Sequence, residues 1–325
     1  MQVYLSKQAG WATAFNPAIT FMQWLCGKLG EGMKDWKTLL LYWGVQFAAA
    51  VPAAILGYAT RPDDGVVACI GKGKYYNIVE GFMNEYIWTI AFCYVFMVMF
   101  YEKELAGNNM YGLVIGFMYM VMGMSKVISG GGYNPAMATG LWFSSSFMKP
   151  SGNDCFVDGW GYIWYFLGGP IGGAATAWLM YKFMHMERFA KFHDYAMEFI
   201  GTFFITFAAC LTIVGGSNFD VGTCIAIFIY VGHYKQSGFY NPVYTLAAFI
   251  NGGLPLLKFA LYTAAQCAGS FSAALMAYLI TRYGSSDGQD FLDAGGSALE
   301  PCTLRAWCGV DAPSSPATLA SHQPL

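Results

Sequence analysis

Tyr133-Asn134-Pro135-Ala136 lies near the middle of this 325-residue chain and decides how the rest is interpreted. The same pattern, an aromatic residue before Asn-Pro, occurs twice more, as Phe15-Asn16-Pro17-Ala18 and Tyr240-Asn241-Pro242-Val243. A Lys and a Gly-containing turn precede each copy, and an apolar stretch follows it. One isolated Asn-Pro would be an ordinary turn or helix start, but three copies in the same setting indicate an internal repeat.

Each copy of the motif contains the residues that begin a helix. The Asn side chain caps free backbone N–H groups, and Pro at the first helical position has no N–H to leave unsatisfied. The apolar stretches that follow are too short to cross a bilayer: Ile19–Cys26, Met137–Phe147 and Tyr244–Ile250. We therefore predict three re-entrant half-helices. Non-helical backbone is tolerated at membrane depth only where it is buried in protein or lines a wet cavity, so these segments indicate a conduction or binding site.

The composition predicts an all-α membrane protein. Hydrophobic residues make up 56% of the chain and charged residues 11%, against the roughly 25% charged residues usual in soluble domains. Seven apolar runs are candidate transmembrane helices: Thr38–Ala59, Tyr86–Tyr101, Met110–Ser125, Gly159–Tyr181, Phe199–Phe219, Val221–Tyr234 and Phe259–Thr281. We expect a multi-pass protein in contact with membrane lipid, inserted by these spans rather than by a cleaved signal peptide.

Several function classes find no support in the sequence. The net charge of −2 offers no basic face for nucleic acid. The nine cysteines form no CxxC pair and the four histidines form no HExxH arrangement, so we expect no metal site, no cofactor and no enzymatic activity.

The repeating unit is span, span, half-helix, span. Residues 84–184 and 195–281 are complete units, residues 1–59 hold only a half-helix and one span, and we expect residues 282–325 to be a disordered tail. An odd number of spans inverts each unit relative to its neighbour, which gives an inverted repeat.

Buried polar residues recur at matched places in these units. Glu85 and Glu198 each lie near the start of a span, where a carboxylate is costly unless it accepts hydrogen bonds. We expect both to hold the backbone amides of a re-entrant loop rather than to transfer protons. Gln46 and Gln266 match each other in the same way on the spans that follow two of the half-helices. Small residues such as Gly168–Gly173 let helices approach closely.

These residues resemble the aquaporin, or major intrinsic protein, family, in which two Asn-Pro-Ala half-helices meet at the middle of a six-helix bundle. The resemblance covers about residues 7–281 and rests on Asn16–Thr20, Ser129–Ala136, Gly168–Gly173 and Met197–Phe203. It implies an aquaporin-like inverted-repeat bundle, here with about seven transmembrane helices and three half-helices, that acts as a passive channel for water or small neutral solutes. It also implies a homotetramer.

The order of the units departs from the family pattern. Residues 195–281 resemble the family's first half, residues 84–184 its second half, and residues 7–59 the end of another first half. Such an order fits a slice through a tandem fusion of two channels or a circular permutation.

The resemblance further implies a pore site at the motifs. Half-helix N-termini aimed at the midplane repel cations, while the Asn amides donate hydrogen bonds to a passing solute. We expect Asn134 and Asn241 to form the pair, with Asn16 as an alternative partner. The motif residues are Asn16, Pro17, Ala18, Asn134, Pro135, Ala136, Asn241, Pro242 and Val243. Val243 replaces the usual Ala and predicts mild strain where half-helices touch.

The constriction residues implied by the resemblance are Met122, Gly131, Met137 and Val221. Met137 stands where the family commonly has Arg, which predicts a wider and less polar filter that passes glycerol, urea or ammonia as well as water. In the alternative interpretation Met122 and Met137 only fill space.

Two other functions are compatible with the sequence. A secondary transporter with broken helices shares the inverted repeat, but it would need ionisable groups along an ion pathway. A non-conducting membrane scaffold, or a truncated tandem aquaporin, is the second alternative, because the first unit lacks its two leading spans.

Overall fold

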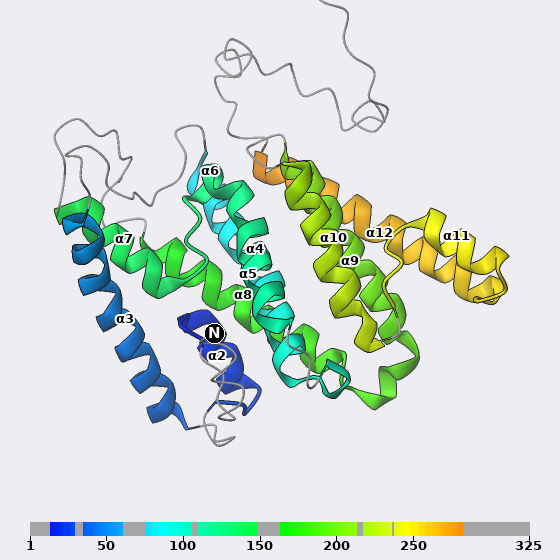
Figure 1. Cartoon of the computed structure of the whole chain (residues 1–325), viewed down its shortest axis with the longest axis horizontal. Coiled ribbons are helices and arrows are strands. Elements are labelled where there is room, and N and C mark those ends of the chain that lie inside the picture. Colours follow the sequence, from blue (N-terminus) through cyan, green and yellow to red (C-terminus); the bar gives the residue numbers. More distant parts are fainter. Residues whose placement is uncertain are drawn as a thin grey trace, which may run out of the picture. The chain divides into compact units, whose positions relative to one another are not determined.

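The computed structural model describes residues 14–29, 35–60, 76–105, 110–147, 163–212, 217–235 and 237–281. All of them belong to one compact unit, Met1–Ser286. The expected tail at 282–325 and the turn around Lys7 lie outside the described residues. Every regular element within the described ranges is a helix (Figure 1).

Seven of these helices lie where spans were predicted: α3 (Trp36–Ala59), α4 (Ile78–Tyr101), α5 (Tyr111–Met122), α8 (Ile163–Phe183), α9 (His193–Leu211), α10 (Asn218–Gly232) and α12 (Leu256–Thr281). Three shorter helices follow the motifs: α2 (Pro17–Leu25), α7 (Pro135–Phe147) and α11 (Pro242–Ile250). The short α6 (Lys126–Ser129) continues α5. Within the described ranges, five helical stretches are long and apolar enough to cross a membrane: Trp36–Ala59, Ile78–Tyr101, Tyr111–Ser129, Glu187–Leu211 and Leu256–Thr281. The all-α membrane fold class is thereby confirmed.

Two predicted span boundaries were wrong. The run Phe199–Phe219 is divided, because α9 ends at Leu211 and Ser217 begins α10 with a capping box, in which Ser217 and Asp220 bond each other's backbone N–H. The helix α4 begins at Ile78 rather than at Tyr86, because Asn77 and Glu80 form a second capping box. The spans were predicted from apolar runs alone, and such runs do not include the polar residues with which these two helices begin.

The three half-helices begin in the same way. In each one the Asn side chain accepts a backbone N–H two residues on, at 2.9 Å for Asn16, 3.1 Å for Asn134 and 2.9 Å for Asn241. The aromatic residue before each Asn adopts a left-handed backbone, with φ of 52° at Phe15, 45° at Tyr133 and 48° at Tyr240. No other non-glycine residue in the described ranges has positive φ. This conformation, which is uncommon for bulky residues, turns the chain sharply into the half-helix.

Glycines allow the closest helix contacts. A Cβ on Gly173 of α8 would lie 2.5 Å from the Tyr86 carbonyl oxygen of α4, and one on Gly269 of α12 would lie 2.5 Å from the Phe199 carbonyl oxygen of α9. The predicted close packing of the Gly168–Gly173 stretch is thus confirmed, because α8 packs along α4 there.

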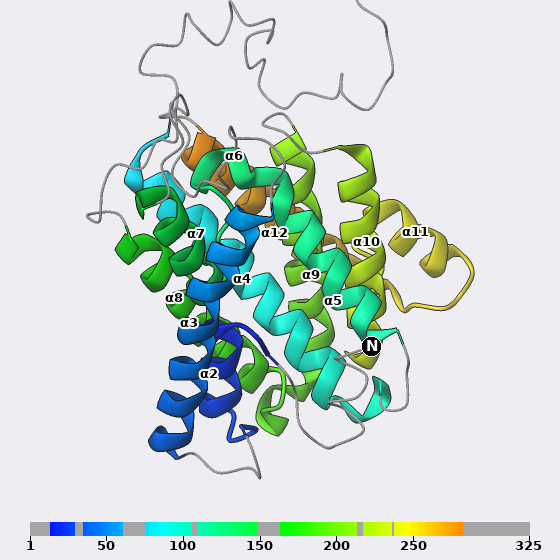
Figure 2. The same cartoon turned by 60° about the vertical axis from the view of Figure 1, so that its left-hand side comes forward.

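The units meet through different helices. The half-helix α2 packs on α8 and α3, while α7 packs on α3 (Figures 1 and 2). The last unit contacts the middle unit through α10, which packs on α5 and α4, and through α12, which packs on α4. Trp88 of α4 lies against Phe204 and Phe207 of α9 in this contact. The half-helix α11 lies beside α12, apart from α2 and α7 in both views.

Candidate functional site

The N-termini of α2 and α7 face each other and exchange two hydrogen bonds. Asn16 Nδ2 donates to the Tyr133 carbonyl at 3.0 Å, and Asn134 Nδ2 donates to the Phe15 carbonyl at 2.9 Å. Each Asn therefore caps its own half-helix with its oxygen and holds the other loop with its nitrogen.

This pairing corrects our expectation that Asn134 would meet Asn241. The first and middle motifs pair, and Asn16 takes the place expected for Asn241. The reason is that the last unit presents α9, α10 and α12 to the middle unit, while α11 packs on α12.

A cavity of about 420 Å³ lies beside the paired motifs, between α3 and α7. Phe15 and Asn134 lie at the motif end of this cavity, and Tyr58 and Ser144 are among its other polar lining residues. Alanine and glycine make up most of the remaining wall, so the cavity offers few fixed charges and space for small molecules. Gly140 keeps α7 close to α3, because a Cβ there would lie 2.7 Å from the Ala50 carbonyl oxygen.

Glu85 anchors the loop that precedes α7. It is fully buried and accepts hydrogen bonds from Ser129 Oγ at 2.7 Å, from the Gly132 N–H at 2.8 Å and from the Tyr133 N–H. The Tyr133 hydroxyl donates to the Met122 carbonyl at 2.9 Å. A carboxylate that receives several donors can be buried, and here it fixes the loop that supplies the Tyr133 carbonyl to Asn16.

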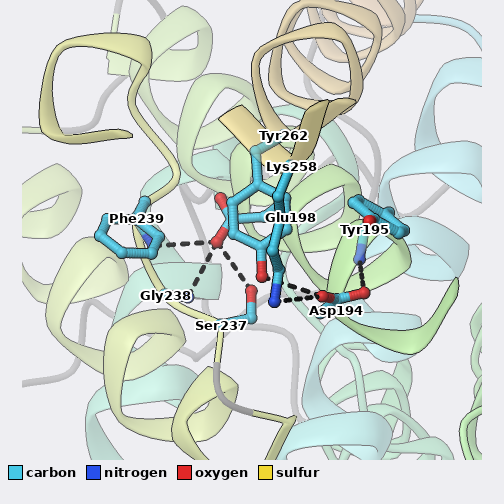
Figure 3. Close-up of polar contacts among 8 residues, drawn as sticks. All are labelled: Asp194, Tyr195, Glu198, Ser237, Gly238, Phe239, Lys258 and Tyr262. Atoms are coloured by element: carbon cyan, nitrogen blue, oxygen red, sulfur yellow. Dashed lines mark hydrogen bonds and ion pairs between the residues drawn. The ribbon is translucent and has the colours of Figure 1, made fainter. Parts of the chain in front are cut away.

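Glu198 anchors the loop before α11 in the same way (Figure 3). It accepts from Ser237 Oγ at 2.7 Å and from three successive backbone N–H groups, at 2.9 Å for Gly238, 3.0 Å for Phe239 and 2.7 Å for Tyr240. Each glutamate therefore bonds the backbone of the loop that precedes a half-helix, Glu85 before α7 and Glu198 before α11.

The two matched glutamines hold the half-helices to the next span. Gln46 Nε2 donates to Thr20 Oγ1 at 2.8 Å, and Gln266 Nε2 donates to Thr245 Oγ1 at 2.8 Å and to Glu198 Oε2 at 2.8 Å. Gln266 is buried as expected, whereas Gln46 is half-buried. The repeated Thr of the first and last motifs, four residues after the Asn in each, is a sequence signal for these two threonines that the motif pattern above does not include.

The structure brings one of the four expected constriction residues to the cavity. Met137 lines it, and the Tyr119 hydroxyl donates to Met137 Sδ at 3.1 Å. Met122 is fully buried in the core, Gly131 lies at φ 73° against Lys126, and Val221 belongs to α10 of the last unit. Sequence reasoning did not find Tyr119.

Val243 is largely exposed, so the strain expected from its extra methyl groups does not arise in this structure. Position 243 would be strained only if α11 were packed as tightly as α2, where Ala18 is completely buried.

A salt bridge joins the ends of α4 and α8 outside the spans. His185 Nε2 lies 2.9 Å from Glu102 Oε1. Burial opposes ionisation of Glu102, but bonds from His185 and Tyr181 outweigh it and hold the pKa of Glu102 below its usual value. The bond to Glu102 raises the pKa of His185. In the last unit, Lys258 Nζ lies 2.8 Å from Asp194 Oδ2 (Figure 3). Among the residues that the structure describes, no cluster of His, Cys, Asp and Glu could hold a metal ion.

Comparison with known proteins identifies one family. A family model described as Major intrinsic protein matches residues 9–181 and, a second time, residues 185–304. Searches among curated proteins and among solved structures find no match.

Proposed function

Because the chain belongs to the major intrinsic protein family, a family of multi-pass membrane channels for water or small solutes, we propose a path for the solute. Solutes pass the paired N-termini of α2 and α7. The observation that carries this proposal is the reciprocal pair of hydrogen bonds between Asn16 and Asn134 and the carbonyls of Tyr133 and Phe15. Members of this family are channels rather than enzymes.

We assign to Asn134 the role of donating a hydrogen bond to the solute. An amide nitrogen has two N–H donors, and one donor of Asn134 already binds the Phe15 carbonyl. The second N–H meets no acceptor among the residues that the structure describes, so it can donate to a solute oxygen in the cavity that Asn134 lines. Asn16 is buried and does not line this cavity, so its role is to position the loop of α7.

The proposed site favours neutral solutes. Each half-helix N-terminus carries a partial charge of about +0.5, and two of them meet at the junction, where they oppose the entry of cations and hydrated protons. Neutral molecules meet no such barrier. The mostly apolar wall and the Tyr119–Met137 contact support passage of small neutral solutes such as glycerol, urea or ammonia, besides water.

A secondary transporter and a non-conducting scaffold each require structural features that differ from those of a channel. A secondary transporter needs ionisable groups free to bind its coupling ion, whereas Glu85 and Glu198 are each occupied by several donors. The first unit favours a non-conducting scaffold. Only 6% of the most apolar stretch of α3 is buried, so this helix leaves an apolar surface open to other molecules. Assembly into a homotetramer, which the resemblance implies, would cover part of that surface.

Flux through reconstituted vesicles tests the proposal. We would record stopped-flow shrinkage under sucrose, glycerol and urea gradients, with Asn134→Asp as the disrupted variant and Asn241→Asp as the matched control. The aspartate at 134 cannot donate to the Phe15 carbonyl, and we expect flux to fall at least about tenfold, equivalent to about 1.4 kcal/mol in barrier height. The same substitution at the exposed motif should leave flux unchanged.

The outcomes separate the candidates. Re-swelling in glycerol or urea would support the wide filter, and dependence on an ion gradient would support a transporter. Shrinkage no faster than in protein-free vesicles, from folded and inserted protein, would overturn the channel and leave the scaffold.

A further inference from the structure

A second cavity, of about 290 Å³, lies where several helices of the last unit begin or end. Its wall is built by the short helix before α9 (Glu187–Phe192), the start of α9, the short helix after α10 (His233–Lys235) and the start of α12. The polar lining residues are Lys191, His193, Asp194, Tyr234, Lys235 and Lys258. Because spans begin and end here, the cavity lies at the membrane surface, within reach of dissolved ions and of lipid headgroups.

The charges of this wall favour an anion. Among the described residues that line the cavity are three lysines and a single carboxylate, that of Asp194. This carboxylate is already bound, because Lys258 Nζ lies 2.8 Å from Asp194 Oδ2 and the Tyr262 hydroxyl donates to the same oxygen at 3.1 Å (Figure 3). The charges of Lys191 and Lys235 are therefore not balanced by the wall, which attracts an anion and disfavours a cation.

The two lysines have no acidic partner elsewhere in the described part of the chain. Lys191 and Lys235 form no ion pair there, and Glu102, on which the charge of Lys235 acts, is paired with His185. Lys235 Nζ lies 4.7 Å from the centre of the Tyr234 ring, which lines the same cavity. A lysine ammonium has three N–H donors, so both side chains can bind further acceptors.

A buried histidine on the same wall lacks a hydrogen-bond partner. The side chain of His193 is buried, with 7% of the residue exposed, and among the described residues its Nε2 meets no donor or acceptor. A buried ring nitrogen without a partner costs free energy, which an occupant of the cavity would offset. This nitrogen accepts a hydrogen bond when it is unprotonated and donates one to an oxygen when it is protonated.

A phosphate monoester meets the demands of the lysines and of the histidine. Its second pKa is about 6, so near neutral pH it exists with and without a hydroxyl, and it offers His193 either a donor or an acceptor. Its other oxygens can accept charge-assisted hydrogen bonds from Lys191 and Lys235. The cavity volume lies near the low end of the range of about 300–1,000 Å³ that is typical of ligand sites, which suits a compact anion.

We propose that this cavity binds a phosphate monoester group, with Lys191 and Lys235 as its charge partners and His193 as its hydrogen-bond partner. Dissolved phosphate and the headgroup of a lipid such as phosphatidic acid carry this same chemistry, and a cavity at the membrane surface admits both. The proposal does not depend on the path of the conducted solute.

Binding of inorganic phosphate to the purified full-length chain in detergent tests the proposal. Equilibrium dialysis with labelled phosphate gives the affinity, and the rise of the unfolding midpoint with phosphate concentration gives an independent measure. Chloride at matched ionic strength is the reference anion. We expect phosphate to bind at least about fivefold more tightly than chloride, the ratio that one net hydrogen bond gives.

Substitutions in the wall identify the site. Lys191→Gln and Lys235→Gln should each weaken phosphate binding at least about tenfold, as expected for the loss of a hydrogen bond from a charged group. His193→Phe keeps a ring, removes Nε2 and should weaken binding about fivefold. Lys182→Gln is the matched control, because this lysine of α8 lies over the Trp178 ring and does not line the cavity. It removes the same charge and should change the affinity by less than about twofold.

Nanodiscs distinguish the two sources of the group. Discs of phosphatidylcholine are compared with discs that also contain phosphatidic acid, a phosphate monoester, or phosphatidylglycerol, a phosphodiester. If the ligand is a lipid headgroup, phosphatidic acid raises the unfolding midpoint more than phosphatidylglycerol does, and Lys235→Gln removes the difference. If it is a dissolved ion, inorganic phosphate raises the midpoint in all three kinds of disc. Either result supports the proposal.

Three results would overturn it. The first is that neither inorganic phosphate nor phosphatidic acid binds. The second is that chloride binds as tightly as phosphate. The third is that Lys182→Gln weakens binding as much as Lys235→Gln, which would indicate general attraction to a basic surface. The elution profile and the ligand-free unfolding midpoint show whether each variant is folded, and the two lysine variants decide the question if His193→Phe is not.

Discussion

The half-helices α2 and α11 show how much of a re-entrant segment is specified locally. They share the capping Asn, the Pro, the left-handed aromatic residue and the Thr–Gln bond to the following span. Ala18, Ile19 and Met22 of α2 are nevertheless buried, while most of α11 is exposed. Local sequence therefore makes the half-helix and aims it, and only a second, inverted half-helix makes a site.

The largest expected effect comes from removing the carboxylates that fix the loops. Glu85→Gln would set an amide NH₂ against donors that now bind a carboxylate, so we expect the free energy of unfolding to fall by about 3 kcal/mol or more and flux to be lost. Glu198→Gln should destabilise the last unit similarly but leave flux in place, because α11 lies outside the proposed path. Thermal unfolding and vesicle shrinkage of both variants check this, and equal loss of flux in both would contradict the comparison.

A smaller effect is expected from exchanging the third motif residue. Ala18→Val adds two methyl groups at a completely buried position and should cost about 1–3 kcal/mol. The reverse change, Val243→Ala, acts on a side chain that is mostly exposed and should alter stability by less than about 0.5 kcal/mol. Chemical unfolding in detergent measures both. A large loss at position 243 would mean that α11 is already packed.

The smallest expected effect is a pH dependence of the free energy of unfolding. We expect it from a residue pair of the middle unit and not from the matching pair of the last unit. The raised pKa of His185 means that its bond to Glu102 stabilises the fold at low pH and is lost as pH rises through that pKa, above the usual value of 6.5. The lowered pKa of Glu102 means that its contribution is lost only as pH falls below the usual value of 4.5.

The pair should thus stabilise the fold most between these limits, by less than about 1 kcal/mol because His185 is well exposed. Unfolding midpoints measured between pH 5 and pH 9 check this, with Glu102→Gln as the variant that should lose the dependence. The Lys258–Asp194 pair of the last unit contains no histidine, so Lys258→Met, which leaves Asp194 beside His193, should leave the dependence unchanged.

The sequence predicted what depends on neighbouring or repeated residues. The three half-helices and their caps follow from residues within each motif, and the anchoring role of Glu85 and Glu198 follows from their matched places in two repeats, about 40 to 48 residues before the loops that they bind. The pairing could not be predicted, because Asn16 and Asn241 lie in almost identical motifs. The two motifs differ in their distant contacts, because α10 and α12 of the last unit pack on α5 and α4 while α11 packs on α12. Composition alone also could not separate Met122, in the core, from Met137, at the cavity.

The separation of 117 residues between Asn16 and Tyr133 has a consequence for synthesis. When α2 leaves the ribosome, the loop before α7 has not been made, so the bonds between the two motifs can form only after more than a hundred further residues have been synthesised. Until then α2 can be held by α3, through the bonds from Gln46 to Thr20 and from Trp43 to the Pro17 carbonyl. The exposed α11 has the same cap and the same bond from a following Gln, so one chain displays a half-helix both with and without an end-to-end contact among the described residues.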